Sequence, residues 1–254
     1  MDVEGSWNRI KHHRSRLSDD EIRGIAEVLF HGQEEWLEEK LLYREDTALA
    51  IEFLGYMGKG GSERAVRVLL KLLGAGEEVL QIAAAEALKL CPDGLVVAPL
   101  AELMLKQNQS SVKAGEIISS FGAIGAQVLW ELWFCENRTT GLKSQIIQLM
   151  AELDDNRLEN LLYLAFMSGE EELIRPALTA AEKIEAKGLW GNVAECLAHP
   201  GWLIRGRAVR LLGKWGEKQA LPYVLDMGAD QDAWVEEERQ KAITLLRGST
   251  LKLI

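Results

Sequence analysis

The sequence predicts an all-α protein, a right-handed α-solenoid of stacked antiparallel helix pairs. A helix-turn-helix unit recurs about every 30 residues, the period typical of solenoids. The alternating apolar pattern typical of strands is nearly absent, and proline is rare, with 5 residues in 254. Each such unit packs mainly against its neighbours, so the array builds one continuous core. Hydrophobic residues form 48% of the chain, which is ample for that core.

The clearest unit runs from His199 to Leu225. Its first helix carries one apolar stripe at helical spacing, formed by Ile204, Ala208, Leu211, Leu212 and Trp215. Gly216 predicts the end of this helix, because glycine adopts the left-handed conformation that closes a helix. A second helix follows, with Leu221, Val224 and Leu225 on its apolar side. Such a pair cannot bury both faces alone and needs neighbours of the same kind.

The same unit recurs along the chain in a fixed register, in which a small or branched residue precedes a large apolar one by four positions. The pairs are Ala50 with Leu54, Ala84 with Leu88, Ile117 with Phe121, Ile146 with Met150, Ala180 with Ile184, Ala208 with Leu212, and Ala242 with Leu246. By subtraction, successive first members lie 34, 33, 29, 34, 28 and 34 residues apart. The next position favours small residues, as in Gly55, Gly122, Ala151 and Gly213.

A basic residue tends to precede that small position by eight places, as Lys143, Arg205 and Arg239 do, with Lys113 one place further away. The apolar-basic pair, as in Ile204-Arg205, followed by an alanine and a Leu-Gly step, resembles the HEAT repeat. It is most similar to the short bacterial form named after phycobilisome lyase subunits. The resemblance covers roughly residues 46–247 and implies a HEAT-like or armadillo-type superhelix. HEAT motifs identify a fold and leave function open.

Four segments are predicted along the chain. Residues 1–17 form a basic leader with Arg9, Lys11, Arg14 and Arg16, expected as a mobile terminus or a short capping helix, or as a tail that docks on an acidic partner. Residues 18–45 form N-terminal capping helices, one opened by a Ser18–Glu21 capping box and one over residues 33–44. Residues 46–247 form the repeat array. Residues 248–254 form an apolar tail that covers the last helix pair or, alternatively, mediates self-association.

Composition bounds the class of protein. The net charge of −10 disfavours a general nucleic-acid binder, which usually has a basic face. The three cysteines, Cys91, Cys135 and Cys196, cannot all pair and form no CxxC, which favours buried reduced thiols and a cytoplasmic setting. The first residues lack the apolar run of a signal peptide, and no apolar stretch approaches the ~20 residues of a membrane span. The oligomeric state stays open, with a monomer favoured.

The HEAT-like resemblance implies that the second helix of each pair lines the concave surface, and the register predicts its residues. Three places before the small position stand Glu52, Glu86, Ser119, Gln148, Glu182, Arg210 and Thr244. Six places before it stand Leu49, Ala83, Glu116, Gln145, Thr179, Arg207 and Lys241. If these residues lie in rows, the surface is acidic in its first half and basic near Arg207 and Arg210.

The strongest electrostatic feature is the basic stripe of Arg207, Arg210 and Lys214, within a run from Arg205 to Lys218 that holds five basic residues and one acidic residue, Glu217. The stripe is a hypothetical site for an acidic protein or peptide. Alternatively, Arg210 pairs with Glu182 of the preceding repeat and the rest is solvated. An exposed Trp202 would be a binding anchor. The candidate partner-binding residues are Arg207, Arg210, Lys214, Glu52, Glu86 and Trp202.

The sequence gives little support for catalysis, because no catalytic or phosphate-binding motif occurs in a suitable setting. No cofactor is predicted, and His12 with His13 lacks the further ligands of a metal site. The His-Glu pairs that ligate iron in the HEAT-like deoxyhypusine hydroxylases do not occur. We therefore expect a non-catalytic scaffold that binds a protein partner on the concave surface. The alternatives are a nucleic-acid-processing protein similar to the HEAT-like DNA glycosylases, and a lyase or chaperone-like subunit that acts on another protein.

Overall fold

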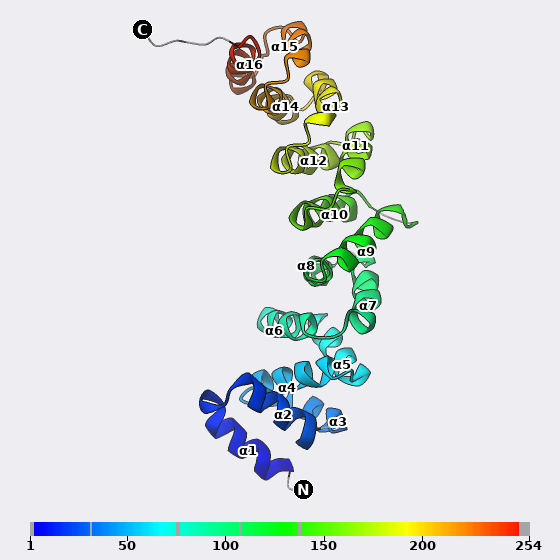
Figure 1. Cartoon of the computed structure of the whole chain (residues 1–254), viewed down its shortest axis with the longest axis vertical. Coiled ribbons are helices and arrows are strands. Elements are labelled where there is room, and N and C mark those ends of the chain that lie inside the picture. Colours follow the sequence, from blue (N-terminus) through cyan, green and yellow to red (C-terminus); the bar gives the residue numbers. More distant parts are fainter. Residues whose placement is uncertain (1–2, 31, 75–76, 107, 137–138, 249–254) are drawn as a thin grey trace. The chain divides into compact units, whose positions relative to one another are not determined.

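A computed structural model describes residues 3–30, 32–74, 77–106, 108–136 and 139–248 (Figure 1). Within these residues all regular secondary structure is helical, as the sequence predicts. The described helices have at most 14 residues, in α10, α14 and α16, and none is long and apolar enough to span a membrane. The chain divides into two compact units, residues 1–132 and 133–254.

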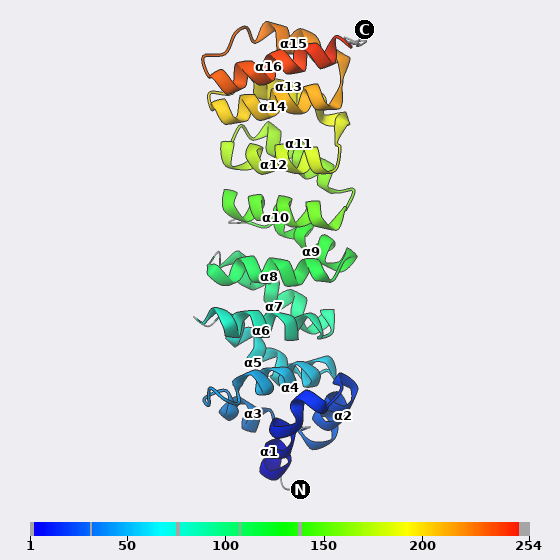
Figure 2. The same cartoon turned by 90° about the vertical axis from the view of Figure 1, so that its left-hand side faces the viewer.

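The first unit begins with three α-helices and one 3₁₀ helix that precede the repeats, and it continues as alternating helices. Its helices are α1 (Val3–His13), η1 (Arg14–Arg16), α2 (Asp19–Leu29), α3 (Glu34–Lys40), α4 (Thr47–Lys59), α5 (Glu63–Leu73), α6 (Glu78–Lys89), α7 (Asp93–Leu105), α8 (Gln109–Ser120) and most of α9 (Ala123–Phe134). Here α4 packs on α6 and α6 on α8, while α3, α5 and α7 stack beside them (Figure 2). Two layers of helices therefore enclose the core.

The second unit repeats the two-layer arrangement. Its helices are α10 (Thr140–Leu153), α11 (Leu158–Met167), α12 (Glu171–Lys183), η2 (Lys187–Leu189), α13 (Trp190–Glu195), η3 (Cys196–Ala198), α14 (Trp202–Trp215), η4 (Lys218–Ala220), α15 (Leu221–Asp226) and α16 (Ala233–Leu246). One layer stacks α10, α12, α14 and α16, and α11 contacts α13 in the other. We call these layers the even-numbered layers: α4, α6 and α8 in the first unit, and α10, α12, α14 and α16 in the second.

Local sequence signals set many helix ends. The Ser18 side chain accepts a hydrogen bond from the Glu21 amide, and the Glu21 carboxylate accepts one from the Ser18 amide, so the predicted capping box is present. Asp232 likewise accepts from the amides of Trp234 and Val235 at the start of α16. Gly216 closes α14 at φ +67°, as expected of a left-handed C-cap. These caps satisfy backbone groups that a helix end leaves without partners.

The predicted register coincides with the core. The first member of every Ala-Leu type pair is buried, and Ala208 and Leu212 are completely inaccessible. The second members are buried too, except Phe121 and Ile184, which are half-buried and directly follow the last residues of α8 and α12. The small positions permit close helix approach: a β-carbon on Gly213 would lie 2.8 Å from the Ala242 Cα, and one on Gly55 would lie 3.0 Å from the Ala87 Cβ. Gly122 differs, because it closes a turn at φ +57°.

The N-terminal leader is a packed helix in the described residues rather than a free tail. Trp7 of α1 is fully buried and meets Phe30, Trp36 and Phe53 edge-to-face, with ring centroids 5.3–6.0 Å from its own. Lys11 forms a 2.6 Å ion pair with the buried Asp46. Burial, the largest single influence, acts to raise the pKa of Asp46, but hydrogen bonds from Lys11 and Trp7 and the nearby charges of Lys11 and Lys40 together hold the pKa below its usual range. The leader thus docks on acidic residues of its own chain.

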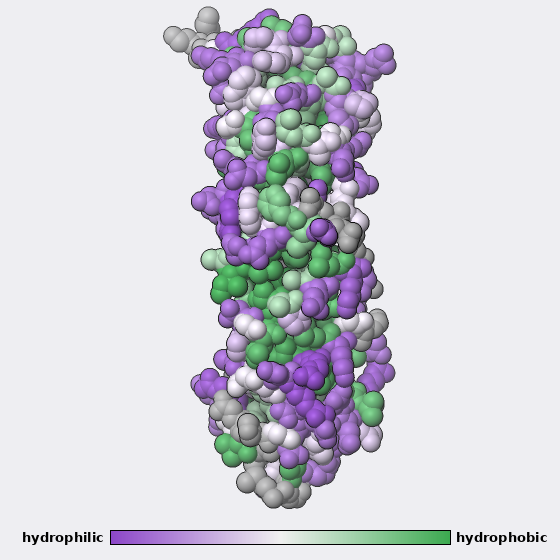
Figure 3. All heavy atoms as spheres, turned by 90° about the vertical axis from the view of Figure 1, so that its right-hand side faces the viewer, coloured by the Kyte–Doolittle hydropathy of each residue, from purple (hydrophilic) through white to green (hydrophobic). Residues whose placement is uncertain are grey.

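Apolar residues also gather on the outer surface of the first unit, over α7 and α9 (Figure 3). These helices bury Val96, Leu100 and Leu129, yet Leu105 and Ile124 on their other sides are exposed. Both helices are therefore apolar around much of their circumference. The predicted apolar tail, 248–254, lies outside the described residues beyond Gly248.

Candidate functional site: a basic groove and an apolar pocket

The predicted basic stripe lies on the exposed side of α14. The helix turns Ile204, Ala208 and Leu212 into the core. Positions 207, 210 and 214 follow an i, i+3, i+7 spacing, so they share a side of the helix that remains accessible. Arg207 is half-buried, while Arg210 and Lys214 are exposed. The sequence pattern alone therefore sets the direction of these side chains.

The stripe faces the preceding helix of the even-numbered layer, α12. Arg207 donates a 3.2 Å hydrogen bond to the Thr179 hydroxyl. Glu182 forms ion pairs with two cations, because Arg210 Nη2 lies 3.6 Å and Lys214 Nζ lies 3.1 Å from its carboxylate oxygens. Thr179 and Arg207, and likewise Glu182 and Arg210, thus lie side by side, as expected if the two register positions form rows. The Arg210–Glu182 pair matches the alternative that the sequence left open.

We call these five residues, Thr179, Glu182, Arg207, Arg210 and Lys214, the basic groove. Two contiguous depressions, of about 290 and 520 Å³, run along it between α12, α14 and α16, and both are lined by Glu182 and Arg210. Arg210 and Lys214 share the Glu182 carboxylate, whereas Arg207 contacts the Thr179 hydroxyl. Such partly exposed pairs contribute only about 0–1 kcal/mol each, so an incoming carboxylate replaces them at little cost. The groove therefore carries excess positive charge in a chain whose net charge is −10.

Trp202 lies at the start of α14, on the side of that helix that faces α16. Its indole is 50% exposed and meets Trp234 edge-to-face, with ring centroids 5.9 Å apart. Trp234 in turn lines the smaller depression of the basic groove together with Arg207. The exposed indole thus adjoins the groove through Trp234, which is the arrangement expected of an aromatic anchor.

Arg205, which belongs to the same basic run, has a different role. Its guanidinium makes a two-pronged contact with Asp230, with Nε 2.6 Å and Nη2 2.9 Å from the carboxylate oxygens. It also donates to the carbonyls of His199 and Pro200. The other basic residues in its register are similarly used, since Arg239 pairs with Glu236 and Lys143 lies 5.2 Å from the Trp133 ring centroid. This basic column stabilises the repeat and does not extend the groove.

The two candidate acidic residues lie in the first unit and have partners within the chain. Arg14 of the leader contacts Glu52 with two nitrogens, the Nε hydrogen bond being 2.8 Å long. Glu86 is exposed and forms a 2.7 Å pair with Lys89 in its own helix. Both line a shallow depression between α4 and α6. Whether the six candidate residues bind a partner stays a prediction.

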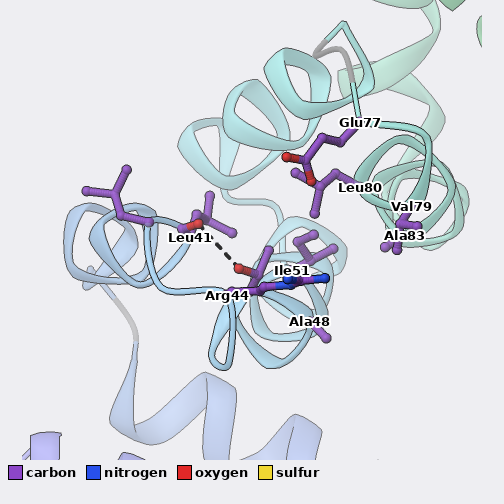
Figure 4. Close-up of a pocket in the computed structure, with 10 residues that line it drawn as sticks. Leu41, Arg44, Ala48, Ile51, Glu77, Val79, Leu80 and Ala83 are labelled. Carbon is purple, nitrogen blue, oxygen red and sulfur yellow. Dashed lines mark hydrogen bonds between the residues drawn. The ribbon is translucent and has the colours of Figure 1, made fainter.

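Sequence analysis missed an apolar pocket of about 690 Å³ in the first unit, between the chain segment after α3 and helices α4 and α6 (Figure 4). Leu41, Ile51 and Leu80 line it, with Ala48 and Ala83 beside them. The predicted helix over residues 33–44 is wrong at its end, because α3 stops at Lys40. The turn that follows directs Leu42 and Arg44 to the rim, a placement that helical spacing does not reveal.

Among the described residues, no group of three or more His, Cys, Asp or Glu side chains is placed to hold a metal ion. The three cysteines are free thiols. Cys91 and Cys196 are buried as predicted, and burial raises their pKa values to about 11 and about 12. Cys135 is only half-buried, so the prediction of a buried thiol is wrong for this residue.

The stacked helix pairs define the class: an all-α helical-repeat protein. No protein-family model matches the chain, and no curated protein matches it. Among solved structures, the chain is similar to the archaeal HEAT-like repeats protein from Thermococcus onnurineus NA1, with 14% identity, a TM-score of 0.47, and coverage of 85% of this chain and 97% of that one. It is also similar to human deoxyhypusine hydroxylase in complex with glycerol, with 15% identity, a TM-score of 0.40 and 97% coverage of both chains. A designed armadillo repeat protein has 16% identity and a TM-score of 0.31, with 83% of this chain and 98% of that one covered.

Proposed function

We propose that this protein is a non-catalytic interaction module that binds an acidic segment of a partner protein in the basic groove. One observation carries the proposal: in the described part of the chain, the side-chain partners of Arg207, Arg210 and Lys214 are the Glu182 carboxylate and the Thr179 hydroxyl. A partner that supplies further carboxylates would pair with these cations and leave the repeat core unchanged. Charge complementarity of this kind steers encounter and fixes orientation more than it adds affinity.

The groove also fits an extended or helical peptide better than an enclosed small molecule. Its two depressions share Glu182 and Arg210 in their linings and open to solvent, and Leu203, Leu211 and Leu245 add apolar contact. Trp202, at the end near Trp234, would cover an apolar side chain of the partner. The expected ligand therefore combines acidic residues with at least one large apolar side chain.

The test is fluorescence anisotropy with a labelled glutamate-rich peptide that contains one leucine, measured at low and at physiological salt. We expect binding that weakens as salt rises, because salt screens exposed charges. Arg207→Glu combined with Arg210→Glu should abolish it. The control variant, Arg64→Glu combined with Arg67→Glu on α5, makes the same change of net charge in the first unit and should bind like the unmodified protein. Equal loss in both variants would contradict a local site.

Nucleic acid is the competing occupant of a basic surface, so a labelled oligonucleotide serves as the second probe. Phosphate contacts would give binding with a steep salt dependence. The protein's net charge of −10 opposes that outcome. Tighter binding of the oligonucleotide than of the acidic peptide, lost in the Arg207→Glu, Arg210→Glu variant, would replace the proposed function with a nucleic-acid one.

A further inference from the structure

The apolar pocket of the first unit is a second surface with the properties of a docking site. Its wall combines Ile51 from α4 with Leu80 and Ala83 from α6, and Leu41 closes the third side (Figure 4). At about 690 Å³ its size falls within the range of ligand pockets. The basic groove belongs to the other unit, so the two surfaces share no residue.

The apolar surface extends beyond the pocket. Leu42 is 82% exposed and Val79 is 76% exposed at the rim, and Ile82 lies exposed one turn further along α6. Leaving such side chains in water costs about 25 cal/mol per Å² of apolar surface that a partner would otherwise cover. A small molecule held in the pocket would leave this rim uncovered. The combination favours a segment of another protein, which fills the pocket with one side chain and covers the rim with its neighbours.

Two side chains of opposite charge line the same pocket. Arg44 approaches from the turn after α3, and Glu77 from the residue before α6. Within the described part of the chain neither forms an ion pair, although nearby Arg64 and Lys71 pair with Glu35 and Glu38. Thr47 is the other polar residue in the lining, and its hydroxyl donates to the carbonyls of Tyr43 and Leu41, at 3.0 and 3.3 Å. The available polar recognition therefore rests on Arg44 and Glu77.

From these contacts we infer that the apolar pocket binds a partner-protein segment in which a large apolar anchor is flanked by an acidic residue on one side and a basic residue on the other. The anchor lies against Ile51 and Leu80. The acidic residue pairs with Arg44 and the basic residue with Glu77, which fixes the direction of the segment across α4 and α6. A segment that runs the opposite way brings like charges together and is rejected.

The experiment is selection of a random peptide library displayed on phage against the immobilised full chain, followed by anisotropy with the most enriched peptide. We expect enriched sequences to share an apolar residue between an acidic and a basic one. The variant Leu42→Ser with Val79→Ser should lose about tenfold in affinity, as removal of anchor contacts typically does. Both residues are so exposed that the change leaves the core intact, which circular dichroism and the unfolding midpoint check.

A charge exchange tests the orientation. Arg44→Glu should weaken binding of the selected peptide about tenfold. A second peptide, in which lysine replaces the acidic residue, should bind the Arg44→Glu variant with the original affinity but should not bind the unmodified protein as tightly. The Arg207→Glu, Arg210→Glu variant should bind the selected peptide normally, which separates this site from the basic groove. Enrichment of the same peptides on the Leu42→Ser, Val79→Ser variant, or no rescue by the exchanged peptide, would overturn the inference. So would concentration-dependent dimers that the rim variant abolishes, because the occupant would then be a second copy.

Discussion

Gly206 of α14 lies directly against the indole ring of Trp234 on α16, and a β-carbon at position 206 would overlap ring atoms of that side chain. Gly213, further along α14, lies in the same way against Ala242 of α16. The two glycines let α14 and α16 approach closely over most of their length. The same ring of Trp234 supports the exposed Trp202 and lines the basic groove. A glycine that serves packing therefore also positions a candidate binding surface.

Gly206→Ala should consequently lower the free energy of unfolding by about 1–3 kcal/mol, the usual cost of overpacking a tightly packed core. The matched control is Gly191→Ala in α13, where an added β-carbon meets nothing within 4 Å. That control should be neutral or stabilising by about 0.4–1 kcal/mol, because alanine restricts the unfolded chain. Urea unfolding followed by tryptophan fluorescence compares the two. Equal stability of both variants would show that the Trp234 ring moves aside for the added β-carbon at no cost in free energy.

Much of the fold could be predicted because its determinants are local and periodic. The Ala208–Leu212 stripe, the Ser18 capping box and the left-handed Gly216 each act within one or two helical turns. Errors arose where spacing is insufficient. The helix predicted over residues 33–44 stops at Lys40, four residues before its expected end.

The candidate site could be predicted only in part, for the same reason. The direction of Arg207, Arg210 and Lys214 follows from helical spacing, and their proximity to α12 follows from the repeat register. Arg205 instead pairs with Asp230, which lies in a loop 25 residues further along the chain, and the repeat register does not predict the position of that loop. The apolar pocket depends on where α3 ends, and a stripe of leucines cannot distinguish a core position from a rim position such as Leu42.

The leader should be essential to the first unit. Trp7→Ala removes a fully buried indole from a cluster of four aromatic rings, so we expect the free energy of unfolding to fall by about 3–5 kcal/mol. Asn8→Ala, at the exposed neighbouring position, is the control and should change stability by less than about 0.5 kcal/mol. Thermal unfolding measures both. A Trp7→Ala variant as stable as the control would mean that α1 contributes little to the core.

Glu236 predicts a pH dependence. Hydrogen bonds from Arg239, then from Gln240 and the Asp230 amide, lower the pKa of Glu236 from 4.5 to about 2. Because the folded-state pKa is depressed, the carboxylate stabilises the fold above about pH 4.5, and this contribution is lost as pH falls through about 2. Glu236→Gln should therefore be less stable by about 1 kcal/mol at pH 6, and the difference should shrink between pH 4.5 and 2. Urea unfolding across this range is the measurement, and a constant difference would contradict the assignment.

The cysteines should differ in reactivity. The thiolate is the reactive form, and burial holds the pKa values of Cys91 and Cys196 at about 11 and about 12. Only the half-buried Cys135 should be labelled by iodoacetamide in the folded protein at neutral pH. Peptide mass analysis identifies the labelled residue, and all three should react after denaturation. Rapid labelling of Cys91 in the folded chain would imply that the packing of its Sγ against Gly58 opens readily.

The basic groove gives a prediction that increases binding. Glu182 occupies Arg210 and Lys214 in the free protein, so it competes with any acidic ligand for the same cations. Glu182→Gln keeps the size of the side chain and removes the competing charge. We expect the glutamate-rich peptide to bind two- to fivefold more tightly, equivalent to about 0.5–1 kcal/mol, with a steeper dependence on salt.

Glu152→Gln is the matched control for this gain. Glu152 lies on the neighbouring helix α10, and its replacement makes the same change of net charge. It also breaks a comparable surface ion pair, that between Glu152 and Lys183. A general electrostatic effect would improve binding equally in both variants, whereas direct competition requires the gain to be confined to Glu182→Gln. A weaker complex in the Glu182→Gln variant would assign a different role to this carboxylate, that of holding Arg210 and Lys214 in the orientation that the ligand needs.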